Sequence, residues 1–355
     1  MKWRLHQAAD FAELAGTWNT LNQAGPNTPL LDARFARACI RYFGSSGEQI
    51  AICEADNKVC CMAVIGSLGL GRWQTFQPSQ APLGFWVQTA DVPFVELLRS
   101  LGRALPGFIT AVGVTQQDPE LLPVPPRQPD VETMPYIETA FIDLPKSFDE
   151  YWSHRGKNLR HNVSRQRNNL KRSGIGLQLE VHDCTDDMES IVRGYGDLEQ
   201  RGWKATQGTA VSPENAQGRF YEAILSEFSR TNEAMAFTLS LNGQLAACDL
   251  CLLRGRTLYV LKTAHDESRK GISSSVLLRY DYLQRIFERI AGGRIEFYGR
   301  IMEWHRRWSE QSKVLYHATL RPSFSARMLG FIAAFRSGVG RAQRRLHESS
   351  LDDPA

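Results

Sequence analysis

A short polar segment between two apolar stretches has the residue types of an anion-binding loop. It runs from His265 through Gly271, and the serines that follow stand where a helix is expected to begin. The first turn of a helix offers unpaired backbone N–H groups and the positive end of the helix dipole, so it attracts phosphate. The residues expected to bind a phosphate or pyrophosphate are Arg269, Lys270, Gly271, Ser273, Ser274 and Ser275. The alternative is that the serines only cap the helix and the two cations are solvated.

Two other residue pairs have spacings that could serve a site. Trp203 and Lys204 follow a predicted helix. They either line a substrate cleft or are a core tryptophan beside a lysine whose stem extends along apolar surface. Cys248 and Cys251 have C-x-x-C spacing, but on a strand their side chains point to opposite faces, and there is no second pair. Neither zinc nor another metal is therefore expected.

Three strands and a helix must position the polar loop. The strands are expected at Ala236–Leu241, Gln244–Leu253 and Thr257–Thr263, with Asn242-Gly243 and Arg254-Gly255 as the turns. After the loop, apolar residues at helical spacing predict a helix that ends at Gly292-Gly293, followed by a strand. This antiparallel order differs from the parallel pattern of a nucleotide-binding fold, and no dinucleotide fingerprint or Walker loop is present.

The preceding part of the chain divides into an early sheet, a long connection and three helices. Strands are expected at Gln49–Cys53, Val59–Ser67 and Trp73–Phe76. Seven prolines between Asp118 and Pro145 predict an extended connection rather than a helix or a central strand, so a domain boundary is placed at its end. Helices are expected over 155–173, 187–200 and 213–231.

Composition limits the class of protein. A length of 355 residues favours two domains, and 43% apolar with 23% charged residues is typical of a globular protein. No apolar run approaches the length of a membrane span, and the first residues do not resemble a secretory signal, so a cytoplasmic location is expected. The seven cysteines, with Cys60 adjacent to Cys61, favour reduced thiols.

The net charge of +4 is concentrated in two segments, Arg155–Arg172 and Arg321–Arg345. The first is suited to gripping RNA phosphates. The second places apolar residues at helical spacing among arginines, so it is either an interfacial helix at an anionic membrane or a helix that packs on the body. If it is interfacial, the protein lies peripherally on the inner face of the membrane.

Five segments occur in an order that is typical of one family. They are Arg155-Gly-Lys-Asn-Leu-Arg-His-Asn-Val-Ser-Arg, Gly202-Trp-Lys-Ala-Thr-Gln-Gly-Thr-Ala, Leu245-Ala-Ala-Cys-Asp, His265-Asp-Glu with Ser273-Ser-Ser-Val-Leu-Leu, and Gly299 with Trp304-His-Arg-Arg-Trp. This order, over about Tyr151 to Leu320, resembles the BioF2-like, CelD-like branch of the GNAT acyltransferase superfamily, which looks related to the FemX-type aminoacyl transferases. That branch commonly has Ser-Pro-Gly in place of Ser273-Ser-Ser, and a lysine in place of His305, which titrates nearer neutrality.

The resemblance implies an α/β (α+β) fold with a GNAT-like mixed, largely antiparallel sheet flanked by helices, in two GNAT-like halves. Residues 1–145 would form a degenerate GNAT-like half and residues 146–320 the GNAT acyltransferase domain. Residues 321–355 would form a basic amphipathic helix and tail. The polar loop would bind the pyrophosphate of acyl-CoA, and backbone N–H groups near Val260 and Leu261 would contact the acyl carbonyl.

Direct acyl transfer also needs a base, and a proton for the departing thiolate. Base candidates are His265 and Asp266, where the strand opens toward the loop, then Asp249 in an apolar strand, and Glu303. Tyr259 and Tyr298 could protonate the thiolate or simply be core residues. The remaining acceptor-binding candidates, beside Trp203 and Lys204, are Arg160, Glu303 and His305. Alternatively, Asp249 pairs with a structural cation such as Lys262, and His265-Asp266 form only a polar turn.

The expected activity is transfer of an acyl group from acyl-CoA to an amine of a cell-envelope precursor, either a polysaccharide amino sugar or a lipid base. Two alternatives stay open: an aminoacyl-tRNA-dependent FemX-like transferase, with tRNA as a partner, and a binding protein that has lost its chemistry. Because basic helices also occur in acyl-CoA-using relatives, the helix at 155–172 does not separate the donors.

Overall fold

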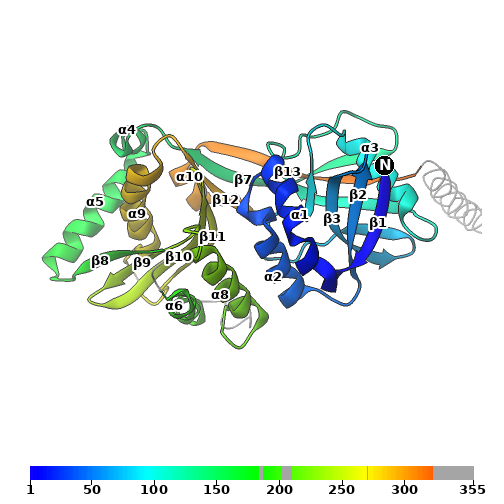
Figure 1. The fold of residues 1–355 in the computed structure, drawn as a ribbon. Helices are drawn as coiled ribbons and strands as arrows, with labels where there is room; N and C mark the ends of the chain where they lie inside the picture. Colours follow the sequence, from blue (N-terminus) through cyan, green and yellow to red (C-terminus); the bar gives the residue numbers. More distant parts are fainter. Residues whose placement is uncertain (184–186, 202–209, 270, 323–355) are drawn as a thin grey trace, which may run out of the picture.

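In the computed structural model, which describes residues 1–183, 187–201, 210–269 and 271–322, the strands form one continuous sheet with helices on both faces (Figure 1). The first half contains β1 (Lys2–Gln7), α1 (Phe11–Ala24), the short helix η2 (Pro29–Leu31), α2 (Ala33–Phe43), β2 (Glu48–Ala55), β3 (Lys58–Gly69), β4 (Arg72–Thr75), β5 (Trp86–Gln88), α3 (Phe94–Ala104), β6 (Ala111–Gln117) and β7 (Val131–Asp143).

The second half follows with α4 (Phe148–Ser153), α5 (Lys157–Arg172), β8 (Leu177–His182), α6 (Met188–Gln200), α8 (Ala216–Ser229), β9 (Ala234–Leu241), β10 (Gln244–Arg254), β11 (Thr257–His265), α9 (Ser274–Ile290), β12 (Arg294–Arg300), α10 (Glu303–Trp308) and β13 (Gln311–Leu320). Within the described residues the strand order is β1-β2-β3-β4-β6-β13-β7-β12-β11-β10-β9-β8, with β5 paired to β3. The sheet is mixed and mostly antiparallel, as expected; the parallel pairs are β4 with β6 and β11 with β12.

Two long strands join the halves. β7 and β13 pair antiparallel from Val131↔Leu320 to Phe141↔Gln311. β13 also pairs with β6 of the first half, whereas β7 also pairs with β12 of the second half. Figure 1 shows both strands running between the two groups of helices. The boundary predicted at residue 145 therefore falls directly after a strand that belongs to both halves.

The proline-rich segment contains a central strand that the sequence analysis did not predict. Pro135 lies in β7, opposite Tyr316, next to a register shift between β7 and β13. Around Pro135, β7 pairs only with β13, because its pairing with β12 begins at Thr139. Proline has no N–H to donate to a neighbouring strand. A strand tolerates proline next to a bulge, or where it pairs with a neighbour on one edge only. The prediction of an extended connection throughout this segment was therefore wrong for residues 131–143.

The three-stranded meander of the second half is confirmed. β9, β10 and β11 follow each other antiparallel, and Asn242 and Gly243 have φ of 51° and 75° in the first turn. Both residues need positive φ in a two-residue hairpin turn of this kind. The helices expected over 155–173, 187–200 and 213–231 are present as α5, α6 and α8.

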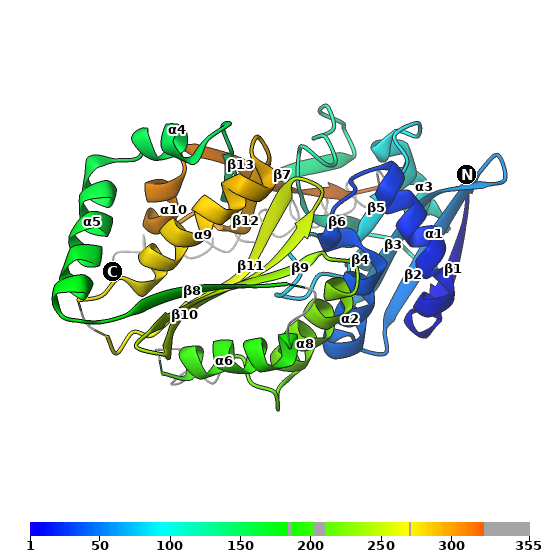
Figure 2. The ribbon, with the colours of Figure 1, turned by 60° about the vertical axis from the view of Figure 1, so that its left-hand side comes forward.

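Helices cover both faces of the sheet. In the second half α9 lies on one face, and α6 with α8 lie on the other (Figure 2). Cys248 packs in the core on the α6 and α8 side and Cys251 on the α9 side, which confirms that their side chains point to opposite faces. One core cluster continues from α6 and α8 to α1 and α2, where Phe35 and Phe220 meet edge to face at 5.4 Å. None of the helices in the described part of the chain is both long and apolar enough to cross a membrane.

An ion-pair network joins the halves beside this core. Arg254 of β10 contacts Asp32 at 2.6 Å and Glu233 at 2.5 Å, and Arg34 of α2 contacts the same two carboxylates at 2.9 and 2.5 Å. Burial alone would raise the pKa of Asp32, but hydrogen bonds from the two arginines outweigh it and lower the pKa overall. The network therefore contains two shielded charge pairs rather than solvated ones.

Substitution Arg254→Ala should destabilise the fold by about 2 kcal/mol, because it leaves two poorly solvated carboxylates with one arginine between them. The free energy of unfolding from urea denaturation measures this. Arg285→Ala is the matched control, since Arg285 forms an exposed i,i+3 pair with Glu288, and it should change stability little. Equal effects of the two substitutions would contradict the importance of the network.

Candidate acyl-transfer site

The second half of the sheet opens between β11 and β12. Their parallel pairing covers only Thr257–Tyr259 and Arg294–Glu296. After Tyr259, β11 continues to His265 and pairs with β10 alone. One edge of β11 therefore has no strand partner after Tyr259 in the described structure. The Thr263 carbonyl of this segment accepts a hydrogen bond from the Tyr195 hydroxyl at 3.2 Å.

A β-bulge lies at the point where the two strands separate. The pairing of β10 with β11 passes from Leu250↔Lys262 to Cys251↔Val260, which leaves Leu261 as an extra residue. Bulges interrupt the ladder and change the direction of the backbone. Of the two residues predicted to bind the carbonyl, Leu261 is thus the bulged residue and Val260 its neighbour, and both lie at the start of the unpaired edge.

The loop after β11 is held by Asp266. Its buried carboxylate accepts hydrogen bonds from the N–H and hydroxyl of Ser268, at 3.0 and 2.6 Å, and from Arg269 Nε at 3.1 Å. Burial raises the pKa of Asp266, but these hydrogen bonds more than offset it, so the net pKa lies below its ordinary value. An ionised, fully engaged carboxylate suits a structural role better than a base. His265 stands exposed at the end of β11.

One serine of the predicted anion site, Ser273 at the start of α9, already has a hydrogen-bond partner. Gln166 of α5 accepts a hydrogen bond from the Ser273 N–H and donates one to the Ser273 hydroxyl, both at 2.8 Å. Ser273 is therefore already engaged. Ser274, by contrast, is fully buried, and its hydroxyl has no hydrogen-bond partner.

The loop backbone next to this turn keeps open space. Gly271 has φ of +89°, with nothing within 4 Å of the position a Cβ would take. Arg269 is also bonded to Gln244 at 2.6 Å. Lys270, Trp203 and Lys204 lie outside the described residues. The described structure thus leaves the loop around the exposed Gly271 and the half-buried Ser275 open to an anion, whereas the Ser274 hydroxyl is buried.

Asp249 is committed to an ion pair beneath α9. Its carboxylate is 3.1 Å from Nη2 of Arg279, and both side chains are buried. The Arg279 guanidinium also lies over the Trp304 ring at 4.4 Å. Burial raises the pKa of Asp249 despite Arg279. The structural partner is thus an arginine of the following helix, whereas the sequence analysis had named Lys262.

The three remaining acceptor candidates lie on α5 and α10. Arg160 is exposed and bonds to the Arg155 carbonyl at 3.0 Å. Glu303 is exposed and pairs with Arg307 at 2.9 Å. Glu303 also lines a cavity of about 580 Å³ between the two helices, whose charged residues include four arginines: Arg155, Arg165, Arg306 and Arg307.

His305 stands where the branch that the sequence resembles commonly has a lysine, and it was expected to titrate near neutrality. The structure gives it a different environment. It is buried, its Nδ1 accepts the Met302 N–H at 2.9 Å, and its ring stacks on Trp304. Burial, with the nearby charge of Arg279, lowers the pKa of His305 to about 4. The side chain is therefore neutral at pH 7 and caps α10, in place of the group titrating near neutrality that the sequence suggested.

A cluster of charged residues that the sequence analysis missed lies beside the opening. Lys313 Nζ of β13 contacts Glu296 and Asp118 at 2.7 Å and Glu120 at 2.9 Å. Glu296 is the last β12 residue paired with β11, and its Oε2 is buried without a partner. Burial raises the pKa of Glu296 to about 7, although Lys313 opposes the shift. The signal was present in the sequence: an acid in an apolar strand, as for Asp249.

Tyr298 connects this cluster to the opening. Its hydroxyl donates to Asp118 at 2.6 Å, and its ring stacks on Tyr259 at 6.3 Å. Tyr298 has φ of +51° at a register shift in β12. Both strands are therefore irregular where they separate, a feature common beside active sites.

The protein should lose stability as the pH falls from 6.5 to 4, since His305 is neutral when folded but takes a proton when unfolded in this range. The substitution His305→Asn keeps a hydrogen-bond acceptor for Met302 and removes the titration. Its free energy of unfolding should vary less with pH in this window, by up to roughly 3 kcal/mol. Urea denaturation at several pH values measures the free energy of unfolding of the wild type and of the variant. An identical pH dependence in the two proteins would contradict a buried, neutral His305.

A comparison with protein families gives a match in the second half of the chain. A family model described as an acetyltransferase (GNAT) domain matches residues 157–306. No curated protein matches the chain in sequence.

Solved structures match over most of the chain. The C-terminal DUF2156 domain of a putative lysylphosphatidylglycerol synthetase from Agrobacterium fabrum has a TM-score of 0.55 at 14% identity, covering 91% of this chain and 95% of that one. FemX has a TM-score of 0.55 at 10% identity, covering 93% and 99%. L-PGS from Bacillus licheniformis has a TM-score of 0.51 at 12% identity, covering 87% and 92%. At such identities the likeness shows the fold. Residues 157–306 therefore match a GNAT acetyltransferase domain, and the chain as a whole has a fold similar to that of FemX.

Proposed function

We propose that the protein is an N-acyltransferase that moves an acyl group from acyl-CoA to an amine of a cell-envelope precursor by direct attack. The observation that supports this best is the bulged, unpaired edge of β11, which leads through an open loop to the first turn of α9. A strand edge beside a helix N-terminus supplies N–H donors to a carbonyl oxygen and to a pyrophosphate at once.

In this proposal the chain holds the donor with backbone groups. N–H groups near Val260 and Leu261 bind the carbonyl oxygen as it becomes an oxyanion, and the turn at Gly271 to Ser275 binds the pyrophosphate. Asp266 fixes the loop, and the Asp249–Arg279 pair fixes α9 against the sheet. The amine attacks the thioester carbon, the carbon–sulfur bond breaks, and CoA leaves as a thiolate that takes up a proton.

Glu296 is the best base among the described carboxylates near the opening. Its pKa of about 7 matches proton transfer at neutral pH, and one of its oxygens has no partner. His265, exposed at the far end of β11, is the other candidate, since it reaches solvent where Asp249 and Asp266 are engaged.

The substitution Gly271→Val should weaken acetyl-CoA binding at least tenfold, because a β-branched side chain at φ of +89° distorts the loop and fills its open space. Titration calorimetry measures it. Gly255→Val is the matched control: Gly255 also has positive φ and open space, but it lies in the β10–β11 turn. Equal weakening in both variants would contradict the loop assignment.

A second candidate is transfer from an aminoacyl-tRNA, and the arginine-lined cavity between α5 and α10 favours it. The same calorimetry separates the two donors. Wild-type protein that binds charged tRNA in a salt-dependent manner, and does not bind acetyl-CoA, would replace the first proposal by the second.

If Glu296 is the base, kcat/KM should rise with pH through about 7. Glu296→Gln should then lower kcat by about 100-fold or more and remove that inflection. CoA thiol release with a panel of primary amines provides the rate. Glu288→Gln, an exposed carboxylate on α9, is the control. If Glu296→Gln keeps the inflection and His265→Ala removes it, His265 is the base.

A further inference from the structure

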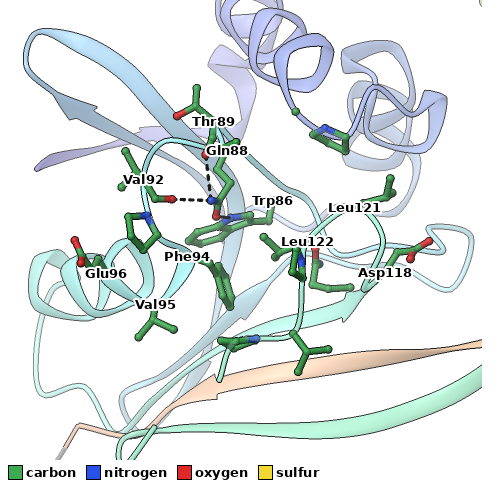
Figure 3. Close-up of a pocket in the computed structure, with 18 of the residues that line it drawn as sticks. Trp86, Gln88, Thr89, Val92, Phe94, Val95, Glu96, Asp118, Leu121 and Leu122 are labelled. Carbon is green, nitrogen blue, oxygen red and sulfur yellow. Dashed lines mark hydrogen bonds between the residues drawn. The ribbon is translucent and has the colours of Figure 1, made fainter. Parts of the chain in front are cut away.

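The first half contains a cavity of about 610 Å³. It lies between the end of α1, β5, α3 and the segment after β6, within the range of about 300–1,000 Å³ typical of small-molecule sites. Figure 3 shows Trp86, Phe94 and Leu122 in the middle of its wall, with Glu96 and Asp118 at opposite ends.

The polar side chains of the wall are mostly bonded within the protein. Gln88 donates to the carbonyls of Thr89 and Val92 and accepts from the Trp86 indole, as the dashed lines of Figure 3 show in part. Gln117 donates to the carbonyls of Gly84 and Thr115, at 3.1 and 2.7 Å. A ligand rich in hydroxyls would lose hydrogen bonds to water and recover few here.

The charged side chains of the wall are similarly engaged. Arg99 pairs with Asp130 at 2.5 Å, and the Asp118 carboxylate bonds to Tyr298 and Lys313. Glu96 is exposed at the rim. The wall therefore offers a ligand mainly apolar surface, from residues such as Val92, Leu121 and Val124. Trp86 and Phe94, whose rings meet edge to face at 5.5 Å, form its largely buried base.

The proline-rich segment forms one side of this cavity. Leu121, Leu122, Val124 and the prolines at 123, 125 and 126 line it. The Tyr316 hydroxyl of β13 donates to the carbonyls of Leu122 and Pro123, at 2.9 and 3.3 Å, and anchors the segment. Prolines fix φ, so this wall is stiff.

One chain of side-chain contacts links the cavity to the opening between β11 and β12. Asp118, at one end of its lining, bonds to Tyr298, which stacks on Tyr259. Tyr259 is the β11 residue at which the two strands separate.

We propose that this cavity binds a hydrocarbon chain, and, resting on the proposed function, that the chain belongs to one of the two reactants of the acyl transfer. The apolar wall, its engaged polar groups and its contact with the opening together select a chain over a sugar. The acceptor would then be a lipid base or the donor a long-chain acyl-CoA, and an amino sugar would not occupy this site.

The test uses dodecylamine, dodecanoyl-CoA, acetyl-CoA and glucosamine, each alone, by titration calorimetry on the full chain. Val92 lines the cavity and is partly buried, so Val92→Trp should fill it and weaken binding of a dodecyl ligand at least tenfold. Val92→Asn, which changes size little, should weaken the same ligand severalfold and guards against a folding defect. Val181→Trp, on the edge strand β8, is the control and should leave binding unchanged.

The outcomes separate the sources of the chain. Weakened dodecylamine binding in Val92→Trp places the acceptor chain in the cavity. Weakened dodecanoyl-CoA binding, with acetyl-CoA unchanged, places the donor chain there. If both variants bind both dodecyl ligands as the wild type does, or if glucosamine binds and dodecyl ligands do not, the proposal is overturned. Acetyl-CoA binding reports on the donor loop alone, so failure of the proposed function is seen separately.

Discussion

The pairing of β7 with β13 is the constraint on which the rest of the structure depends. Each strand is hydrogen-bonded in both halves, so the orientation of one half fixes that of the other. Glu296 and Tyr298 stand on β12, directly beside β7, whereas Lys313 and Tyr316 stand on β13. The charged cluster beside the opening between β11 and β12 and the anchor of the cavity wall thus lie on one rigid ladder. A change of angle between the halves would break both.

Three of the buried charge clusters described above are paired across elements. Asp249 with Arg279 joins a strand to a helix, Arg254 with Asp32 joins the two halves, and Lys313 joins three carboxylates. A buried charge without its partner is costly because it has lost its hydration. Arrangements of the elements that separate such a pair are therefore disfavoured. Glu296, beside the opening, and Asp249 each keep one buried oxygen without a partner, and burial raises the pKa of both. Such imbalance beside an opening is typical of groups that handle protons.

Local patterns predicted the second half well and the junction poorly. The Asn242-Gly243 turn and the apolar stripe of α9 are short-range signals, and both elements formed where expected. β7 was missed because seven prolines outweighed its apolar residues, and its partner β13 lies far away in the chain. The loop after β11 was predicted, but Gln166 at Ser273 and Arg279 at Asp249 depend on packing between distant elements. The cavity of the first half carries no motif at all.

The place of β13 in the sheet also determines when the molecule can become complete. Among the strands of the described residues it is the last in chain order, yet it lies between β6 and β7, far from the edges. During synthesis both of those strands leave the ribosome long before it and present unpaired edges, which are sites of misassociation. Neither half can close its hydrogen-bond ladder until the other has been translated. The newly made chain therefore completes the opening between β11 and β12 and the cavity of the first half together, in one late step of folding.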